Sequence, residues 1–222
     1  MKTLILISGK MRSGKNQFAD FLNCALLEKN KLSRFDLFAA DLKKGCEEDF
    51  SYMMKNLNNH IALIKEELAY SRIDVNSLKV VTPLLDDLMI TKSENWYENK
   101  TMMSSLLIQT YGTQIFRKRV NKHHWVDQVL SRAISCDDEY ILVTDARYEN
   151  EIERTKDVCI QNDIRVITFR IERDLAKNSL YEHESENALD DYKNWDFVIN
   201  NNGTLDDLKL RAFEFARLYV ED

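Results

Sequence analysis

The chain has 222 residues, enough for one large α/β domain or at most two small ones. Its 37 acidic residues outnumber its 31 lysines and arginines, and the formal net charge of −6 argues against a nucleic-acid backbone or an anionic membrane as main partner. The four cysteines form no C-x-x-C pair, and no apolar run is long enough for a signal peptide or a membrane span. We therefore expect a cytoplasmic protein whose anionic ligands are small molecules held in a local cationic pocket.

Strand-like and helix-like patterns alternate along the chain. Short apolar runs typical of buried parallel strands are followed by segments whose apolar side chains recur every three or four residues, as on one face of a helix. This alternation predicts one doubly wound parallel sheet with helices on both faces. The expected strands are residues 4–7, 35–39, 140–145, 165–171 and 195–199, and the expected helices start at 16, fill much of 41–76, and cover 102–111, 124–134, 148–162 and 204–219.

Particular residues set some of the predicted boundaries. Thr204 stands three residues before Asp207, which gives a capping-box-like start to the last helix. The helices over 102–111 and 124–134 are expected to be joined across Gly112 and the basic cluster 117–119, which lie outside both helices. Residues 84–100 give no clear pattern.

Residues 9–16 (GKMRSGKN) fit the pattern G-x-x-x-x-G-K, directly after the first predicted strand and before the first predicted helix. Gly9 and Gly14 let the backbone turn tightly and approach phosphate oxygens without a side chain in the way. The backbone amides of 13–16 then point into one concavity at a helix start, and Lys15 reaches the β and γ phosphates. The motif and its context predict a site for a nucleoside triphosphate.

Two oxygen-bearing side chains are candidate magnesium ligands. Asn16 stands where Ser or Thr is usual, and its amide oxygen can ligate the ion or hold a metal-bound water. Asp145 ends an apolar strand, as a Walker-B acid does; the alternative is that it caps the helix that starts near Arg147. The guanidinium of Arg147 belongs to the carboxyl edge of the sheet, where ligands of open α/β folds bind, and suits bidentate contact with phosphate.

Four segments, in this order, resemble the bacteriophage deoxynucleoside monophosphate kinases. The loop is similar to their G-x-x-R-S-G-K-D, with Asn16 in place of the acid, and 144–147 (TDAR) resemble their D-x-R segment. Residues 107–125 resemble L-x-Q-x-x-G-T-x-x-x-R … W, and 183–205 resemble H-x-x-E … D-x-x-I-x-N-x-G-x-L. The matches extend from residue 3 to about 208 and leave roughly 42–101 without a motif.

The resemblance implies a kinase that uses ATP and Mg²⁺ to phosphorylate a deoxynucleoside monophosphate. It also implies a three-layer α/β sandwich with a five-stranded parallel P-loop kinase sheet, forming a single kinase domain over 1–222. Within that domain we expect a mostly helical acceptor-binding insertion at about 42–135 and a short lid at about 172–195. Direct contact with nucleic acid or a membrane is not expected, and a homodimer is left open.

This scheme assigns a role to each candidate residue. The catalytic candidates are Arg12, Lys15, Asp145, Arg147 and Arg173, with Arg170 as a further cation near the lid. ATP is expected to contact Gly9, Arg12, Ser13, Gly14, Lys15, Asn16 and Asn200, and the expected metal ligands are Asn16 and Asp145. The acceptor is expected to contact Lys43, Gln109, Arg117, Trp125 and Arg147.

Two other hypotheses remain open. Animal-type phosphomevalonate kinases share the loop style, the D-x-R segment and the C-terminal pattern, and are the nearest rival. A nucleotide-dependent switch acting on a protein partner is the second. Two absences argue against a GTPase switch. The element N-K-x-D is missing, because Asn121 and Lys122 are followed by two histidines, and no hydroxyl follows Lys15.

Overall fold

The computed structural model describes residues 1–45, 108–174 and 184–220 of the chain. These residues belong to two compact units. Unit 1 comprises Met1–Phe38, Val126–Leu180 and Ser185–Asp222, and unit 2 comprises Ala39–Trp125 and Tyr181–Glu184. The expectations for 46–107 and 175–183 lie outside the described residues, so the extents of the acceptor insertion and of the lid stay predictions.

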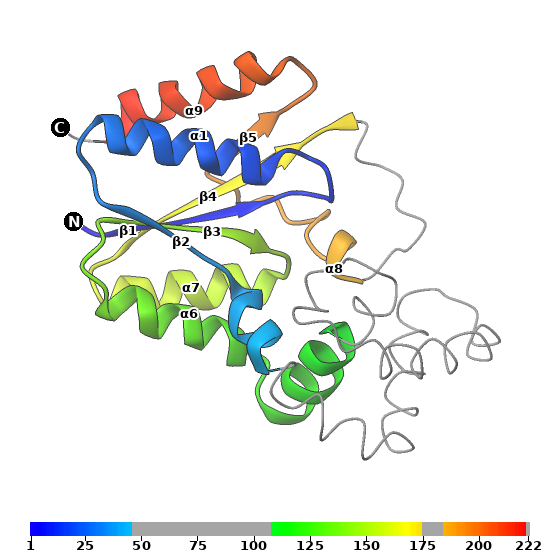
Figure 1. Ribbon diagram of the computed structural model, residues 1–222. Coiled ribbons are helices and arrows are strands. Elements are labelled where there is room, and N and C mark those ends of the chain that lie inside the picture. The colour runs from blue at the N-terminus through cyan, green and yellow to red at the C-terminus, as the bar shows by residue number, and fades with distance from the viewer. Residues whose placement is uncertain (46–107, 175–183, 221–222) are drawn as a thin grey trace, which may run out of the picture. The chain divides into compact units, whose positions relative to one another are not determined.

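Unit 1 is built on a five-stranded sheet with the strand order β2-β3-β1-β4-β5 (Figure 1). All neighbouring strands are parallel. The central strand β1 is buried along its whole length, which explains its unbroken apolar sequence. The predicted parallel sheet is thus confirmed, with strands β1 (Thr3–Ser8), β2 (Ser33–Asp36), β3 (Tyr140–Ala146), β4 (Arg165–Glu172) and β5 (Phe197–Asn200).

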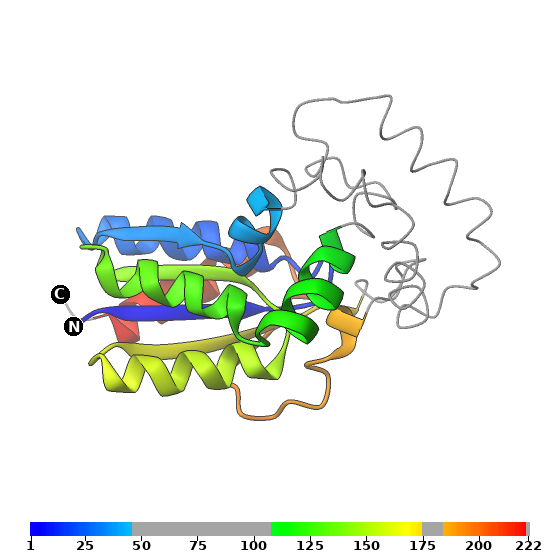
Figure 2. The same ribbon diagram turned by 90° about the horizontal axis from the view of Figure 1, so that it is seen from below.

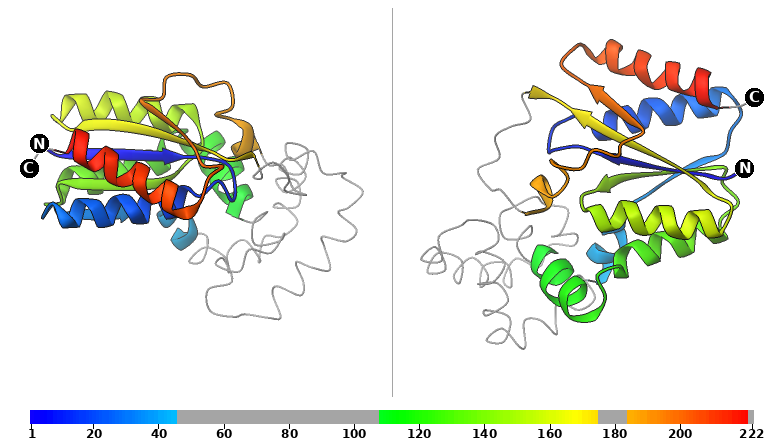
Figure 3. Two further views of the ribbon diagram at one scale, coloured as in Figure 1. Left: turned by 90° about the horizontal axis from the view of Figure 1, so that it is seen from above. Right: turned by 180° about the vertical axis from the view of Figure 1, so that it is seen from behind.

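Helices cover both faces of this sheet. On one face lie α1 (Lys15–Glu28) and α9 (Leu205–Tyr219), which are seen from above in Figure 3. On the other face lie α6 (His124–Ser135) and α7 (Glu149–Gln161), which run side by side in Figure 2. Unit 1 is therefore a three-layer α/β sandwich, as the alternating pattern predicts.

The side chains of β1 serve both layers because they alternate across the sheet. Ile5 and Ile7 belong to one apolar core with residues of α1 and α9, among them Phe18 and Phe215. Leu4 and Leu6, which have the opposite parity, are also completely buried. The strand that leads into the phosphate loop is thereby fixed from both sides.

The second strand ends earlier than the sequence predicts. β2 stops at Asp36 and residues 38–45 are helical, whereas we expected a strand over 35–39. The Asp36 carboxylate accepts from the Leu37 N–H at 2.8 Å, and Asp145 accepts from the Phe38 N–H at 2.9 Å. These carboxylates satisfy amides at the start of the helix, as side-chain caps do, and so favour a helix there.

A π-helix, η2 (Thr110–Val120), runs through Gly112 and the basic cluster, where the sequence predicts a separation. The break comes later, before α6. Trp125 Nε1 donates to the Gly112 carbonyl at 3.2 Å, and a Cβ on Gly112 would stand 2.9 Å from Leu42 Cδ2. Close packing within unit 2 is therefore the reason for this glycine, and it does not end the helix.

The last helix begins as predicted. The N–H of Asp207 donates to Thr204 Oγ1 at 3.2 Å, and the N–H of Thr204 donates to the Asp207 carboxylate at 2.8 Å. The hydrogen bonds from the backbone and the side chain of Thr204 hold the pKa of Asp207 below its ordinary value.

The chain also includes a short helix, α8 (Glu184–Asn187). No helix in the described ranges is long and apolar enough to cross a bilayer.

Candidate active site

The phosphate loop connects the carboxyl end of β1 to the first turn of α1. Gly14 precedes the helix with a φ of 93°, a left-handed conformation that favours glycine. Arg12 is also left-handed, with a φ of 64°. Within the loop the Ser13 N–H donates to the Lys10 carbonyl at 3.1 Å, and the Phe18 N–H donates to the Gly14 carbonyl at 2.9 Å.

Both glycines of the motif are also required by close approaches. A Cβ on Gly9 would lie 2.7 Å from the carbonyl oxygen of Ile171 and would collide with Ser13 Oγ. A Cβ on Gly14 would collide with the side-chain amide of Asn201. The loop is therefore packed against β4 on one side and against the segment after β5 on the other.

An unsatisfied hydroxyl lies inside this loop. Ser13 is 1% exposed, and its Oγ has no hydrogen-bond partner among the described residues. Leaving a buried hydroxyl unpaired costs about 1–3 kcal/mol. The first turn of α1 also contains no acidic residue, so the positive end of the helix dipole is not opposed there. These features fit a loop that completes its hydrogen bonds with an anionic ligand.

Lys15 is partly buried at the start of α1. Its Nζ donates to the Lys10 carbonyl at 3.4 Å, so the ammonium group folds back over the loop. Asn16 is exposed in the same helical turn. The structure thus places residues 9–16 as the sequence predicts, in one turn between the central strand and a helix.

Asn201 supports the loop and was not predicted from the sequence. It is 8% exposed, and its Nδ2 donates to the Ser13 carbonyl at 2.8 Å. The neighbouring Asn200, which we expect to contact ATP, is exposed, and its Oδ1 accepts from the Asn202 N–H at 3.0 Å. The alternation of side chains along β5 could have identified Asn201, because Asn201 is an even number of positions after Phe197, whose side chain packs against the core.

Asp145 lies at the carboxyl end of β3, which pairs directly with β1, so the expected neighbour relation of the two strands is confirmed. Its Oδ1 accepts from Phe38 at the start of helix 38–45. The amides before α7 are instead satisfied by Glu151, whose Oε2 accepts from Arg147 N at 2.6 Å and from Tyr148 N at 3.0 Å. Glu151 thus supplies a carboxylate to these amides, and the N-cap residue of α7 is Tyr148.

The candidate arginines differ in their surroundings. Arg12 and Arg173 are exposed, and Arg147 is partly buried after β3. Arg170 is only 7% exposed; it donates to Ser8 Oγ at 3.2 Å and to Asp190 Oδ1 at 2.9 Å. Arg170 is thus a buried, paired charge and not a solvated one.

Asp190 completes this arrangement and had no signal in the sequence. Its Oδ2 accepts from Lys10 Nζ at 2.7 Å, across 180 positions of the chain. A contact over such a separation depends on the tertiary arrangement of the strands, which the local sequence pattern does not give.

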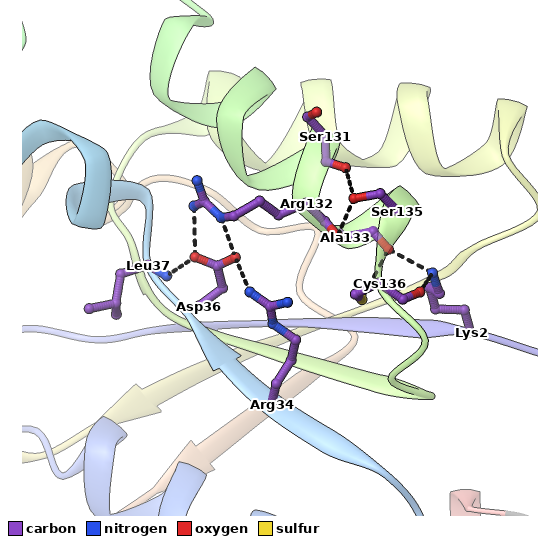
Figure 4. Close-up of polar contacts among 9 residues, drawn as sticks. All are labelled: Lys2, Arg34, Asp36, Leu37, Ser131, Arg132, Ala133, Ser135 and Cys136. Carbon is purple, nitrogen blue, oxygen red and sulfur yellow. Dashed lines mark hydrogen bonds and ion pairs between the residues drawn. The ribbon is translucent and has the colours of Figure 1, made fainter.

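Asp36 organises the end of β2 on the same edge of the sheet (Figure 4). Its carboxylate accepts from Arg132 at 2.9 and 2.8 Å, and from Arg34 at 3.4 Å. At this same end of α6, Lys2 Nζ donates to two carbonyls of the last turn, those of Ala133 at 2.8 Å and Ile134 at 3.1 Å, and to the Cys136 carbonyl just beyond the helix at 2.6 Å.

The predicted acceptor residues, apart from Arg147, belong to unit 2. Trp125 is 3% exposed and packs among aromatic rings, with centroids 4.8 Å from Phe116 and 6.3 Å from Tyr111. Lys43, Gln109 and Arg117 are partly buried. Their contacts with an acceptor stay predictions.

The family model described as deoxynucleotide monophosphate kinase matches residues 50–212, well over half of the chain. None of the curated proteins matches it. Among solved structures, a cysteine mutant of the Mycobacterium tuberculosis APS kinase aligns with 10% identity over 97% of each chain, at a TM-score of 0.45. The family match begins after the phosphate loop, so loop and match are separate observations.

Proposed function

The chain belongs to the deoxynucleotide monophosphate kinase family and is a phosphotransferase, and we propose that its phosphate loop holds the ATP from which the γ-phosphoryl group is taken. The single observation that carries this proposal is the loop itself. Ser13 Oγ is buried there without a partner among the described residues, and both glycine positions have no room for a side chain. The hydrogen-bonding capacity of this loop suits an oxygen-rich anion.

The residues of the loop have distinct roles in this proposal. The amides at the start of α1 bind the phosphate oxygens, and Lys15 meets the negative charge that moves toward the bridging oxygen during transfer. Arg12 and Arg147 are proposed to hold the transferred group and the acceptor phosphate in line, because a guanidinium binds two oxygens in a fixed plane. Transfer needs little covalent work from the protein, so positioning and charge stabilisation supply most of the catalysis.

Asn16 and Asp145 are the proposed holders of Mg²⁺. Amide, carboxylate and water oxygens are the ligands that this ion prefers, so the donor set fits. When bound, magnesium neutralises charge on the β and γ phosphates. Asp145 already accepts from the Phe38 N–H through Oδ1, and this hydrogen bond fixes the orientation of the carboxylate.

The acceptor class follows from the family, and the acceptor contacts are proposed. The proposed contact residues remain Lys43, Gln109, Arg117, Trp125 and Arg147. Arg173 and Asn200 are proposed to contact the nucleotide as well, on the sequence resemblance alone.

A coupled ADP-release assay with each of the four deoxynucleoside monophosphates, and with phosphomevalonate, tests the proposal. We expect ADP release that depends on one or more of the deoxynucleotides. Turnover with phosphomevalonate alone would assign the chain to the rival kinase class. Release that ignores every acceptor would indicate an NTPase that acts on another partner.

A further inference from the structure

We infer that Asp190 is a positioning residue for the ATP site, an inference that rests on the proposed function. Asp190 lies on the segment between α8 and β5, outside the phosphate loop. Its two carboxylate oxygens bind two different cations, Arg170 Nη2 at 2.9 Å and Lys10 Nζ at 2.7 Å. One carboxylate therefore links Arg170 on β4 to Lys10 in the phosphate loop.

The contact with Arg170 fixes the residue that precedes the loop. The Arg170 side chain is 9% exposed, and its Nη1 donates to Ser8 Oγ at 3.2 Å. Ser8 is the last residue of β1 and is 1% exposed. A buried guanidinium without a carboxylate is strongly disfavoured, so Asp190 is what allows Arg170 to stay beside the start of the loop.

The contact with Lys10 acts on the loop itself. The Lys10 carbonyl accepts from the Ser13 N–H at 3.1 Å and from Lys15 Nζ at 3.4 Å. The side chain of the same residue is held by Asp190, and it also donates to Asn187 Oδ1 at 3.4 Å. Fixing Lys10 at its side chain therefore restricts the carbonyl that orients both the loop backbone and the catalytic lysine.

The segment that carries Asp190 is itself anchored to the body of unit 1. The hydroxyl of Tyr192 donates to Glu153 at 2.7 Å and accepts from Lys156 at 2.8 Å, both on α7. The Asp196 carboxylate accepts from the Thr168 hydroxyl at 2.7 Å. Because these contacts tie the segment to α7 and to β4, the position of Asp190 is set by the fold and not by the loop it supports.

The two ion pairs do not have equal weight. Lys10 and Asp190 are 34% and 38% exposed at their side chains, so solvent screens their attraction. The Arg170 side chain is screened far less. We therefore expect Asp190→Asn to have a larger effect than Lys10→Met, and both effects to fall on ATP and not on the acceptor.

The test measures KM for ATP, KM for the acceptor and kcat in full-length variants by ADP release, with ATP binding followed separately by calorimetry. Asp190→Asn is expected to raise KM for ATP about tenfold, and Lys10→Met about threefold, with KM for the acceptor unchanged. The double variant should lose no more than Asp190→Asn alone, because both changes break one network. Asp190→Glu should recover part of the loss, and the exposed neighbour Asp191→Asn is the matched control.

Three results would overturn the inference. The first is a KM for ATP in Asp190→Asn equal to that of Asp191→Asn. The second is an equal rise in both KM values, and the third is a double variant whose losses multiply. Should Asp190→Asn not fold, Lys10→Met carries the comparison, and an unchanged KM for ATP in that variant counts against the inference. A wild-type chain that binds no ATP would instead remove the proposed function.

Discussion

Lys15 is the residue on which the proposed chemistry depends most. In this structure its ammonium group rests on the Lys10 carbonyl at 3.4 Å, at the first turn of α1. Lys15→Ala should lower kcat by at least about a hundredfold, as the loss of one transition-state donor does. The ADP-release assay measures this effect, and Lys31→Ala, beyond the other end of α1, is the matched control. Full activity in Lys15→Ala would disprove the role.

Asn201 links the last strand to the loop by a buried hydrogen bond to the Ser13 carbonyl. Asn201→Ala leaves that carbonyl without its partner, which should lower the free energy of unfolding by about 1–3 kcal/mol. It should also weaken ATP binding, because the loop loses a support next to Gly14. Urea unfolding and calorimetry measure the two effects, with the exposed Asn194→Ala as control. A variant as stable as the control would show that the bond contributes nothing.

Cys159 on α7 is completely buried, and burial raises the pKa of its thiol from an ordinary 9.0 to about 11. The folded state therefore keeps the proton that the unfolded chain loses. The stability from this group is fully present below pH 9 and is lost as the pH rises toward 11. Urea unfolding at pH 8 and pH 10.5 should show a smaller loss in Cys159→Ala than in Cys24→Ser, whose wild-type thiol is exposed. Equal losses in the two variants would contradict the assignment.

At the scale of elements, the end of β2 is held by one charged cluster. The Asp36 side chain is 5% exposed and pairs with Arg132, which is 31% exposed, and with Arg34. Asp36→Ala should lower the free energy of unfolding by about 3 kcal/mol, because it removes the buried carboxylate that Arg132, Arg34 and the Leu37 N–H share. Thermal or urea unfolding measures the change. The exposed Asp20→Ala on α1 should change it little, and equal stability of the two variants would refute the role of the cluster.

The sequence predicted the elements whose signal is local. The continuous apolar run of β1, the Thr204 capping box of α9 and the glycine-rich turn each follow from neighbouring residues, and the structure has all three. The end of β2 was not predictable in this way. The carboxylate of Asp145, more than a hundred positions away, accepts from the first amide of helix 38–45.

The same distinction applies to the site. The loop and its lysine could be predicted from one short motif. The supporting residues could not, since Asp190 contacts Lys10 across 180 positions and Arg170 becomes buried only when β4 pairs with β1. At Gly112 the local pattern was misleading. The sequence analysis placed this glycine between two helices, whereas the structure has it inside η2, where close packing against Leu42 requires a residue without a side chain.

For the whole molecule, two separate observations support one account. The family match covers residues 50–212, and the phosphate loop lies before it, at the end of the central strand. The net charge of −6 does not oppose the account, because residues 9–16 hold three cations and no acid. A protein that is acidic overall can therefore still bind a triphosphate at this turn.

The most direct test is a calorimetric titration of the intact chain with magnesium ATP. The account predicts a saturable heat with one site per chain, and the loss of that heat in Gly14→Val, whose side chain would collide with Asn201. The absence of any binding heat in the folded wild-type protein would contradict it, as would binding that Gly14→Val leaves unchanged.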